Sequence, residues 1–415
     1  MDGRYPALCG LVQSGAEALM KRFALCLPDA GVWTGGVNYV ATVCRALLAH
    51  PDLGYEPVVF CSPAAAAPVQ ARFASLLGAR LVRHPYLARG RRAGLMRAVT
   101  LGRNRAMYAL CEHNGIDVIM EAADFFGWRF PFTCLAWVPD FQDRHLPELF
   151  SRAARYRRSL GLQLQLAAGR SVLLSSEDAR GDCERFYPRA RTRTAVARFA
   201  VSPALAPGEC DPQVQQSHHL PARFFYLPNQ YWAHKNHVRV AEALELLRDR
   251  GVNVVVASSG NPSDPRLLGH YESLRSLVAA RRLTQHFLFL GSVSAREVAV
   301  LMRRAVAMLN PSLFEGWSTT VEEAKSLGVR MVISDLSVHR EQLGDDAVFF
   351  APDDPRAIAD CLERVWLDAR APPTLAEQQS AAVWAAARIR EFAEQLTCAA
   401  DRARANSRLT SRRAS

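Results

Sequence analysis

The sequence predicts an α/β protein in which two Rossmann-like, doubly wound domains face each other across a cleft. Its 415 residues exceed what one compact core usually holds. Short apolar runs alternate with longer amphipathic segments, which is typical of a parallel sheet with helices on both faces. A stretch rich in Pro, Ser and Gln at 199–221 interrupts this alternation and separates two series of elements.

The first series begins at residue 22. Its amphipathic segments, with apolar residues at three-to-four spacing, predict helices at 37–50 and 178–186. Its short apolar runs predict buried strands, which are RFALCLP (22–28), EPVVFCS (56–62), IDVIMEA (116–122), TCLAWVPD (133–140) and SVLLSSE (171–177).

The second series begins near residue 223 and repeats the same alternation. The predicted strands are RFFYLPN (223–229), NVVVASSG (253–260), HFLFLG (286–291), VAMLNPS (306–312) and RMVISD (330–335). The predicted helices are 236–250, 265–282, 294–305, the segment after 318, and 354–368. We therefore divide the chain into an extension (1–19), a first domain (20–205), a linker (206–221), a second domain (222–385), a C-terminal helix that returns to the first domain (386–405) and a disordered tail (406–415).

Composition favours a cytoplasmic protein. No apolar run reaches the ~18 residues that span a bilayer, and no basic segment followed by an apolar one resembles a signal peptide. The ten cysteines are scattered without a C-x-x-C pair, which predicts reduced thiols and neither disulfides nor a zinc site.

The net charge of +11 comes almost entirely from arginine, because lysine occurs only at positions 21, 235 and 325. A basic balance suits anionic small molecules or an anionic membrane surface. No nucleic-acid-binding signature is present, so we expect no nucleic-acid partner. The stretch 80–105 has eight arginines and no acid. It is either a solvated face or a membrane contact, which would place the protein at the inner face of the membrane.

The segment LFEGWSTTVEEAKSLG (313–328) follows a predicted strand and begins a predicted helix. One interpretation is a capping box, with Thr320 as N-cap and Glu323 three residues later; Thr319 with Glu322 would serve equally. Capping leaves Glu315 unexplained.

The alternative for the same segment is a ligand clamp. The free N–H groups of a helix start suit phosphate, and the hydroxyls of Ser318, Thr319 and Thr320 add donors. Glu315 and Glu323 on either side could each accept hydrogen bonds from sugar hydroxyls. The implied ligand has negative charge in the middle and hydroxyls at both ends.

Two further loops follow strands and carry unusual residues. YLPNQYWAHKNH (226–237) contains Lys235 just before a helix that Asn236 can cap. The lysine is either an ordinary loop residue or a point charge for a diphosphate. In VWTGGVNY (32–39), the Gly35–Gly36 pair is either a plain turn or a place of close ligand approach. Neither G-x-G-x-x-G nor a Walker loop occurs.

Together these motifs resemble the retaining glycosyltransferases of the GT-B fold. The similar group is family four, which includes bacterial polysaccharide and lipopolysaccharide mannosyl- and glucosyltransferases. The resemblance covers about 22–390 and rests on FEGWSTTVEEA as an E-x7-E motif, PNQYWAHKNH, SDLSVHREQ (334–342), TGGVNY and WVPDFQDRHLPELF (137–150).

The resemblance implies transfer of a hexose from a nucleoside-diphosphate sugar (GDP-mannose or a UDP- or dTDP-hexose) to a glycan or lipid-linked saccharide. By position, Glu315 would bind the donor sugar, Glu323 the ribose and Lys235 the diphosphate. The backbone of Ser318, Thr319 and Thr320 would hold the distal phosphate, and Gly35–Gly36 would face it.

In the first domain, the resemblance places Asp140 near the transferred sugar, with His145 as the fallback. Many relatives have an arginine where this chain has Asn229, so we assign Asn229 to the diphosphate loop. No D-x-D motif occurs. We therefore expect neither a metal ion nor a cofactor.

Three rival functions remain open. A sugar-nucleotide epimerase would share the architecture but need no acceptor. A phosphorylase would need a lysine that holds pyridoxal phosphate, and none of the three lysines has a suitable setting. A non-enzymatic module for anionic polymers or membranes would explain the arginines of 80–105, but not Glu315, Glu323 and Lys235 together.

Overall fold

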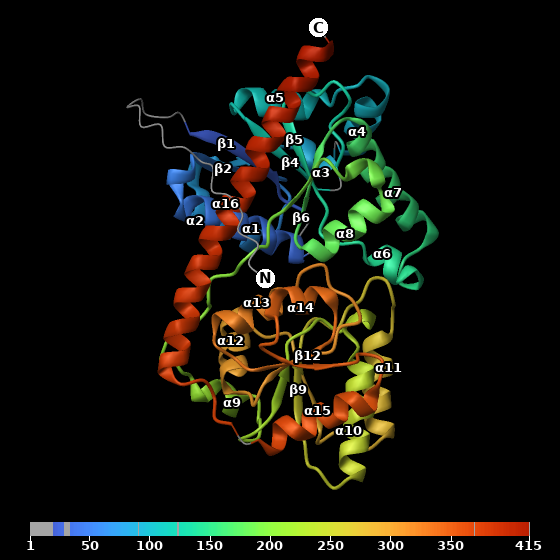
Figure 1. The fold of residues 1–415 in the computed structure, drawn as a ribbon, viewed down its shortest axis with the longest axis vertical. Coiled ribbons are helices and arrows are strands. Elements are labelled where there is room, and N and C mark those ends of the chain that lie inside the picture. Colours follow the sequence, from blue (N-terminus) through green and yellow to red (C-terminus); the bar gives the residue numbers. More distant parts are fainter. Residues whose placement is uncertain (1–19, 29–33, 90, 123, 369, 415) are drawn as a thin grey trace, which may run out of the picture.

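The computed structural model describes residues 20–28, 34–89, 91–122, 124–368 and 370–414 (Figure 1). The predicted extension 1–19 lies outside this part of the chain. Two α/β domains are stacked, each built on one parallel sheet with helices around it. The predicted fold class is therefore confirmed.

The first domain contains a seven-stranded parallel sheet with strand order β3-β2-β1-β4-β5-β6-β7. From β1 the chain adds β2 and then β3 outward to one edge of the sheet. It then returns to the middle, where β4 pairs with the other side of β1, so β1 and β4 flank the switch point. The strands are β1 (Lys21–Cys26), β2 (Tyr55–Cys61), β3 (Leu81–Arg83), β4 (Val118–Ala122), β5 (Thr133–Trp137), β6 (Ser171–Leu174) and β7 (Thr194–Val196).

The second domain repeats this topology in a six-stranded parallel sheet with order β10-β9-β8-β11-β12-β13. Here β8 and β11 are neighbours at the switch point, with Met308 opposite Tyr226. The strands are β8 (Phe225–Leu227), β9 (Val256–Ser259), β10 (Phe287–Gly291), β11 (Met308–Asn310), β12 (Met331–Ser334) and β13 (Val348–Phe350).

The strands are continuous apolar runs because helices cover both faces of each sheet. In β1, Phe23 and Leu25 belong to the core under α1, whereas Ala24 and Cys26 belong to the core under α5. The first-domain helices are α1 (Thr34–Ala49), α2 (Ala67–Leu77), α3 (Tyr86–Arg89), α4 (Arg91–Thr100), α5 (Arg105–His113), α6 (Gln142–His145), α7 (Arg152–Ala167) and α8 (Glu177–Phe186).

Helix boundaries in the second domain follow local capping chemistry. The helix α12 begins with a capping box, in which Ser294 accepts from the Glu297 N–H and the Glu297 carboxylate accepts from the Ser294 N–H. The other helices are α9 (Pro212–Ser217), α10 (His237–Asp249), α11 (His270–Ala280), α12 (Ala295–Arg304), α13 (Thr319–Ser326), α14 (Ser337–Leu343) and α15 (Pro355–Leu367). Within the predicted linker, α9 packs against α12, and its Val214 is in the second-domain core.

The final helix, α16 (Leu375–Ala414), runs along both domains (Figure 1). It starts against α13 and then packs Phe392 and Leu396 into the core of the first domain. It is longer than the predicted helix at 386–405, and the expectation of disorder fails over 406–414. The reason is that no Gly or Pro interrupts the chain after Pro373, so nothing in the sequence stops helix propagation.

Two expectations from composition can be compared with the structure. Within the described ranges, no helix combines the length and the apolar character needed to cross a bilayer. The cysteines in these ranges form no disulfide with one another.

Candidate active site

A cavity of about 220 Å³ lies between the two domains. Loops that follow strands at their carboxyl ends form its walls, as expected for doubly wound sheets. The first domain contributes Gly35, Asn38, Tyr39, Thr42, Trp137, Pro139, Asp140, Gln142 and Ser175, and the second contributes Trp232, His234, Lys235, Phe314, Glu315, Gly316, Trp317 and Thr319; Phe199 and Val201 complete it.

An ion pair between Lys235 and Glu315 forms the charged part of the wall. Lys235 Nζ lies 2.5 Å from Glu315 Oε1, and only 13% and 10% of the two side chains are exposed. Ser312 Oγ is 2.7 Å from the same carboxylate oxygen. Burial alone would raise the pKa of Glu315, but the charge of Lys235 and the Ser312 hydrogen bond outweigh it and hold the pKa low. Glu315 is therefore ionised at neutral pH.

The two residues meet because β8 and β11 are adjacent, although Lys235 and Glu315 are 80 positions apart. A hydrogen bond from Leu313 N to His234 O (2.8 Å) joins the loops that follow these strands. His234 also borders the cavity, a role that sequence reasoning missed, although it precedes Lys235 directly. Burial and the neighbouring Lys235 and Arg266 charges lower the pKa of His234 well below its usual range, so the ring is neutral.

A buried amide network supports this wall from behind. Asn310, fully buried at the end of β11, accepts a hydrogen bond from Asn229 Nδ2 (3.1 Å) and donates one to Ser318 Oγ (3.1 Å). Asn229 is only 3% exposed and does not border the cavity. Its assignment to the diphosphate is therefore not supported, because its side chain is already bonded to Asn310. Asn236 likewise donates its side chain to Pro311 O and Pro352 O and does not cap α10.

The predicted capping box at the start of α13 is wrong. Ser318 is the N-cap, but its hydroxyl is bonded to Asn310 and accepts from no helix N–H. The Ser318 N–H donates to Gln342 Oε1 (3.1 Å), and Gln342 Nε2 donates back to Ser318 O (3.1 Å). We find no partner within the described chain for the N–H groups of Thr319 and Thr320. The helix end that faces the cavity thus starts at Thr319, which borders it.

Glu323, the second acid of the motif, lies one turn further along α13 and does not border the cavity. Burial raises the pKa of its carboxyl to about 7. No hydrogen bond or ion pair to this carboxylate is found among the described residues. It is close enough to Tyr226, whose hydroxyl lies 2.5 Å from Ser259 Oγ, to raise the pKa of that tyrosine. The structure therefore leaves a half-buried acid available at the far end of the motif.

Asp140 occupies the first-domain wall opposite this motif. Its Oδ1 accepts hydrogen bonds from Arg158 Nη2 (2.7 Å) and from the Gln142 N–H (3.1 Å). Gly316 packs directly against the same loop, because a Cβ there would come within 2.3 Å of Pro139 O. Only glycine at position 316 allows the two domains to approach this closely.

The other first-domain predictions have mixed outcomes. His145 does not border the cavity; its Nε2 lies 2.5 Å from Asp182 Oδ2 and its ring stacks on Phe314. It is therefore not a substitute for Asp140. Gly35 borders the cavity, whereas Gly36 is buried and does not. Both lie in the first turn of α1, which begins at Thr34 and not at residue 37 as the sequence predicts.

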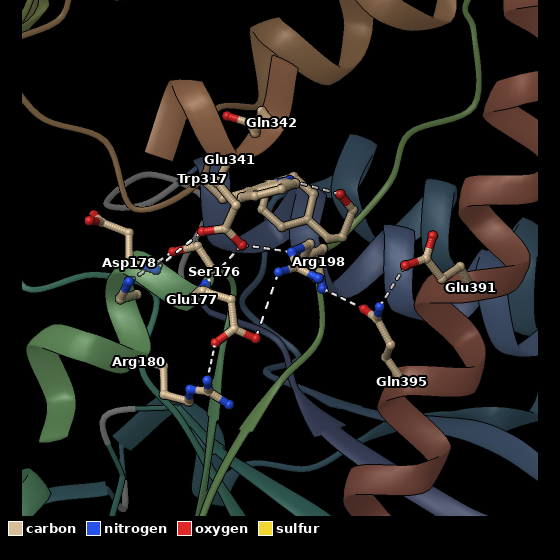
Figure 2. A network of polar contacts seen from close by, with 12 residues as sticks. Ser176, Glu177, Asp178, Arg180, Arg198, Trp317, Glu341, Gln342, Glu391 and Gln395 are labelled. Atoms are coloured by element: carbon tan, nitrogen blue, oxygen red, sulfur yellow. Dashed lines mark hydrogen bonds and ion pairs between the residues drawn. The ribbon is translucent and has the colours of Figure 1, made fainter. Parts of the chain in front are cut away.

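A polar network joins the domains beside the cavity (Figure 2). The Glu341 carboxylate, on α14, accepts hydrogen bonds from the backbone N–H groups of Glu177 (2.9 Å) and Asp178 (3.1 Å). It also accepts one from Arg198 Nε (2.7 Å). An acid of the second domain thus caps the start of the first-domain helix α8, where free N–H groups and the helix dipole favour negative charge. Sequence reasoning quoted Glu341 within SDLSVHREQ but gave it no role.

Two more hydrogen bonds run between the domains in the same region. Ser176 Oγ donates to Gly316 O (2.9 Å), and Trp317 Nε1 donates to Phe199 O (3.0 Å). Figure 2 shows Trp317 beside the network of Glu341 and Arg198. The motif FEGWSTTVEEA therefore contributes both to the cavity and to the contact that holds the domains together.

A second cavity of about 410 Å³ adjoins the first and shares Trp137, Pro139, Asp140, Gln142 and Trp232 with it. Its remaining wall comes mainly from the first domain, and α7 is a large part of it. The lining is rich in aromatic and basic side chains, which are Phe141, Phe150, Tyr187, Arg157, Arg158 and, from the second domain, Arg266. Among the described residues, no group of three or more His, Cys, Asp or Glu is arranged to hold a metal ion.

Comparison with known proteins places this geometry in a family. Residues 214–382 match the family model described as glycosyl transferases group 1. The O-antigen chain mannosyltransferase RfbU of Salmonella typhimurium is 29% identical over 93 residues. That match covers 22% of this chain and about a quarter (26%) of the length of the relative.

Solved structures share the fold across nearly the whole chain. A glycosyltransferase from Rickettsia africae matches with a TM-score of 0.65 at 14% identity, covering 91% of this chain and 98% of that one. HepE of Anabaena, solved in complex with UDP-glucose, matches with a TM-score of 0.66 at 14% identity, covering 90% and 97%. Residues 214–382 are therefore similar to the glycosyl transferases group 1 family, and the chain as a whole has the GT-B fold.

Proposed function

We propose that this protein is a retaining glycosyltransferase that moves a hexose from a nucleoside-diphosphate sugar to a saccharide acceptor, free or linked to a lipid. The observation that carries the proposal is the mostly buried pair of Lys235 and Glu315, 2.5 Å apart, in the wall of an inter-domain cavity that the first residue of α13, Thr319, also borders. This arrangement offers a cation, amide donors and a carboxylate side by side.

Each part suits one part of such a donor. The free N–H groups of Thr319 and Thr320 and the positive end of α13 suit a phosphate. Lys235 has three N–H donors, so it can contact the diphosphate while it holds Glu315. Glu315, ionised and aimed along the cavity wall, would accept hydrogen bonds from hydroxyls of the hexose. Glu323 would accept from the ribose.

The mechanism follows from where charge develops. As the glycosyl–phosphate bond stretches, negative charge grows on the leaving diphosphate, and Lys235 with the helix end stabilises it. The acceptor hydroxyl attacks from the same face of the sugar and passes its proton to the departing phosphate, so the anomeric configuration is retained. The contact between Gly316 and the Pro139–Asp140 loop would exclude water from this step.

The relatives supply the first donors to test. HepE was solved with UDP-glucose, and the O-antigen relative is named a mannosyltransferase. We therefore expect one of GDP, UDP, dTDP or ADP to raise the melting temperature of the protein in a thermal-shift panel. No stabilisation by any of the four would contradict the proposal. Conversion of the donor without any acceptor would instead indicate an epimerase.

A calorimetric comparison tests the two acids separately. Glu323→Ala should weaken binding of the selected nucleoside diphosphate, because it removes the ribose contact. Glu315→Ala should leave binding of the free diphosphate largely unchanged and reduce turnover of the sugar donor. Unchanged nucleotide affinity in Glu323→Ala would remove the ribose assignment.

A further inference from the structure

Exposed apolar side chains gather on one part of the first domain. The described part of the chain has twelve large hydrophobic residues that are well exposed, and seven of them come from α4, α7 and the loops beside α4. Single exposed apolar residues are ordinary, but a group of them marks an interaction surface. We call this group the α4–α7 face; it contains Leu95, Met96, Val99, Leu101, Trp128, Tyr156 and Leu160.

Hydrogen bonds join the elements that carry these residues. Trp128 Nε1 donates to Val99 O (3.2 Å), and Arg129 N donates to Gly102 O (2.7 Å), which ties the loop after β4 to the end of α4. The same loop is tied to α7 because Gln165 Nε2 donates to Asp124 O (2.8 Å). Figure 1 shows α4 and α7 on the same side of the first domain.

The two helices of this face carry positive charge alone. Neither α4 nor α7 contains an acidic residue. Among the described residues, Arg97, Arg152 and Arg157 are exposed and form no ion pair with a carboxylate. The side chains of Arg89, Arg91 and Arg92, which the sequence also brings to this stretch, lie outside the described ones.

Some arginines elsewhere are paired with acids. In the second domain, Arg239, Arg250, Arg281 and Arg340 each contact an acidic side chain, at 2.6–2.7 Å. Their positive charge is largely compensated at the surface. In the same domain Arg275, Arg282, Arg356 and Arg364 are exposed without such a contact among the described residues, so the α4–α7 face differs by the exposed apolar side chains beside its arginines.

This combination identifies the partner by chemistry. Apolar side chains interspersed with unpaired arginines suit the boundary between lipid headgroups and acyl chains, with anionic headgroups around the arginines. We propose that the α4–α7 face docks on a bilayer that contains anionic lipid. An anionic polymer would match the arginines, but it would leave Leu95, Met96 and Leu101 without a partner.

The location of the second cavity adds a consequence that rests on the proposed function. Arg157, Gly161 and Leu162 of α7 border that cavity, whereas Tyr156 and Leu160 of the same helix are exposed. A single helix thus has one side on the docking face and another on the cavity beside Asp140. A saccharide carried on a membrane lipid would reach this cavity without leaving the membrane surface.

Vesicle flotation tests the docking. The full-length protein should float with vesicles of phosphatidylcholine and phosphatidylglycerol, but not with phosphatidylcholine alone, and about 0.5 M NaCl should release it. Changing Arg97 and Arg152 together to Ser should weaken binding at least about tenfold, as should changing Met96, Leu101 and Tyr156 to Ser. The matched control changes Leu268, Leu367 and Val383, equally exposed in other parts of the molecule, to Ser and should bind like wild type.

Tryptophan fluorescence tests the orientation. Trp128 is 41% exposed on the docking face. Brominated anionic lipids should therefore quench the wild-type protein and quench the Trp128→Phe variant less, whereas Trp366→Phe in the second domain should be quenched like wild type.

Several outcomes would overturn the docking proposal. The proposal fails if the protein binds neutral vesicles equally well, if it binds neither kind of vesicle, or if both face variants bind like wild type. It also fails if the chain binds no vesicle but self-associates, and the face variants abolish this self-association. The nucleotide panel runs on the same variants and should be unchanged. Docking without nucleotide binding would reject the proposed function alone, and nucleotide binding without docking would reject this inference alone.

Discussion

The two walls of the inter-domain cavity are built in different ways. The second-domain wall is a set of buried polar groups bonded to one another, from Lys235 and Glu315 to Asn310 and Gln342. The first-domain wall combines a stacked aromatic pair with separate polar side chains: the ring centroids of Tyr39 and Trp137 are 3.9 Å apart, and Asp140 is its charged group.

This difference separates two tasks. A wall of fixed charges is preorganised for a ligand of fixed charge, and its parts cannot be exchanged without leaving a buried group unpaired. A wall of stacked rings and separate polar side chains recognises mainly shape and tolerates substitution more easily. We therefore expect variants of the second-domain wall to lose far more activity than variants of the first.

The largest effect is expected for Lys235→Ala. Turnover should fall on the order of 10²-fold or more, because the leaving diphosphate loses a fixed cation. Lys235 is mostly buried, and its loss leaves Glu315 without its counter-charge. We therefore expect the variant to lose a few kcal/mol of stability as well.

Lys21→Ala is the matched control, because Lys21 pairs with Asp401 at the surface, with a distance of 2.7 Å. Turnover is measured with the donor that the nucleotide panel selects, and stability by urea unfolding. Wild-type turnover in Lys235→Ala would make this lysine a structural residue.

A second effect concerns pH and Glu323. Because the folded pKa of about 7 is above the value near 4.3 of an unfolded glutamate, the folded state binds more protons between these values. The free energy of unfolding should therefore fall as pH rises from about 4 to 7, by up to about 3 kcal/mol. Glu323→Gln should remove this part of the pH dependence.

Nucleotide affinity should change with pH in the opposite direction to the free energy of unfolding. Ribose hydroxyls donate to the ionised carboxylate, so wild-type affinity should rise with pH up to about 7, and Glu323→Gln should show little change. Glu242→Gln, on the surface of α10, is the control. Parallel pH profiles for wild type and Glu323→Gln would show that this acid does not titrate in the proposed range.

A smaller effect is expected at the domain contact. Glu341→Gln keeps the shape but removes the charge that caps α8 and pairs with Arg198, so the closed arrangement should be less populated. We expect kcat to fall about tenfold or less, with little change in nucleotide Kd. Glu177→Gln is the control, since its carboxylate is 41% exposed and lies 3.7 Å from Arg198. A change in Kd without a change in kcat would place the effect in binding and not in closure.

The smallest effect is expected for metal removal. EDTA should leave turnover unchanged if Lys235 and the end of α13 alone compensate the diphosphate charge. Loss of activity in EDTA that Mg²⁺ or Mn²⁺ restores would show that a divalent ion shares this task.

The contrast between the walls also explains what could be predicted from sequence. The strands were predictable because burial on both faces makes each one a continuous apolar run, as in β1. Glu315 and Lys235 were predictable because their chemistry needs particular residue types next to strand ends. The start of α13 was not, since the side chain that competes for Ser318 belongs to Asn310, and no local pattern shows that contact.

The first-domain wall was harder to predict for a related reason. The sequence 139–145 offers Asp140, Asp143 and His145 within one short loop, and only packing decides which of them faces the cavity. Arg158 pairs with both aspartates, and Asp182 draws His145 away. The strand β3 was missed because only three residues form it, within a stretch dominated by arginine.

The path of α16 has a mechanical consequence. The chain passes between the domains twice, once before α9 and once along α16, which contacts α13 at its start and the first-domain core further on. A joint with two connectors can rotate about the line through both, but it resists sliding and separation. Opening of the cavity should therefore be a swing about an axis near α16. Because α13 contacts α16 and has its N-terminal end at the cavity, the helix proposed to hold the diphosphate lies close to this rotation axis. Asp140 belongs to the first domain and would move relative to that helix when the cavity opens.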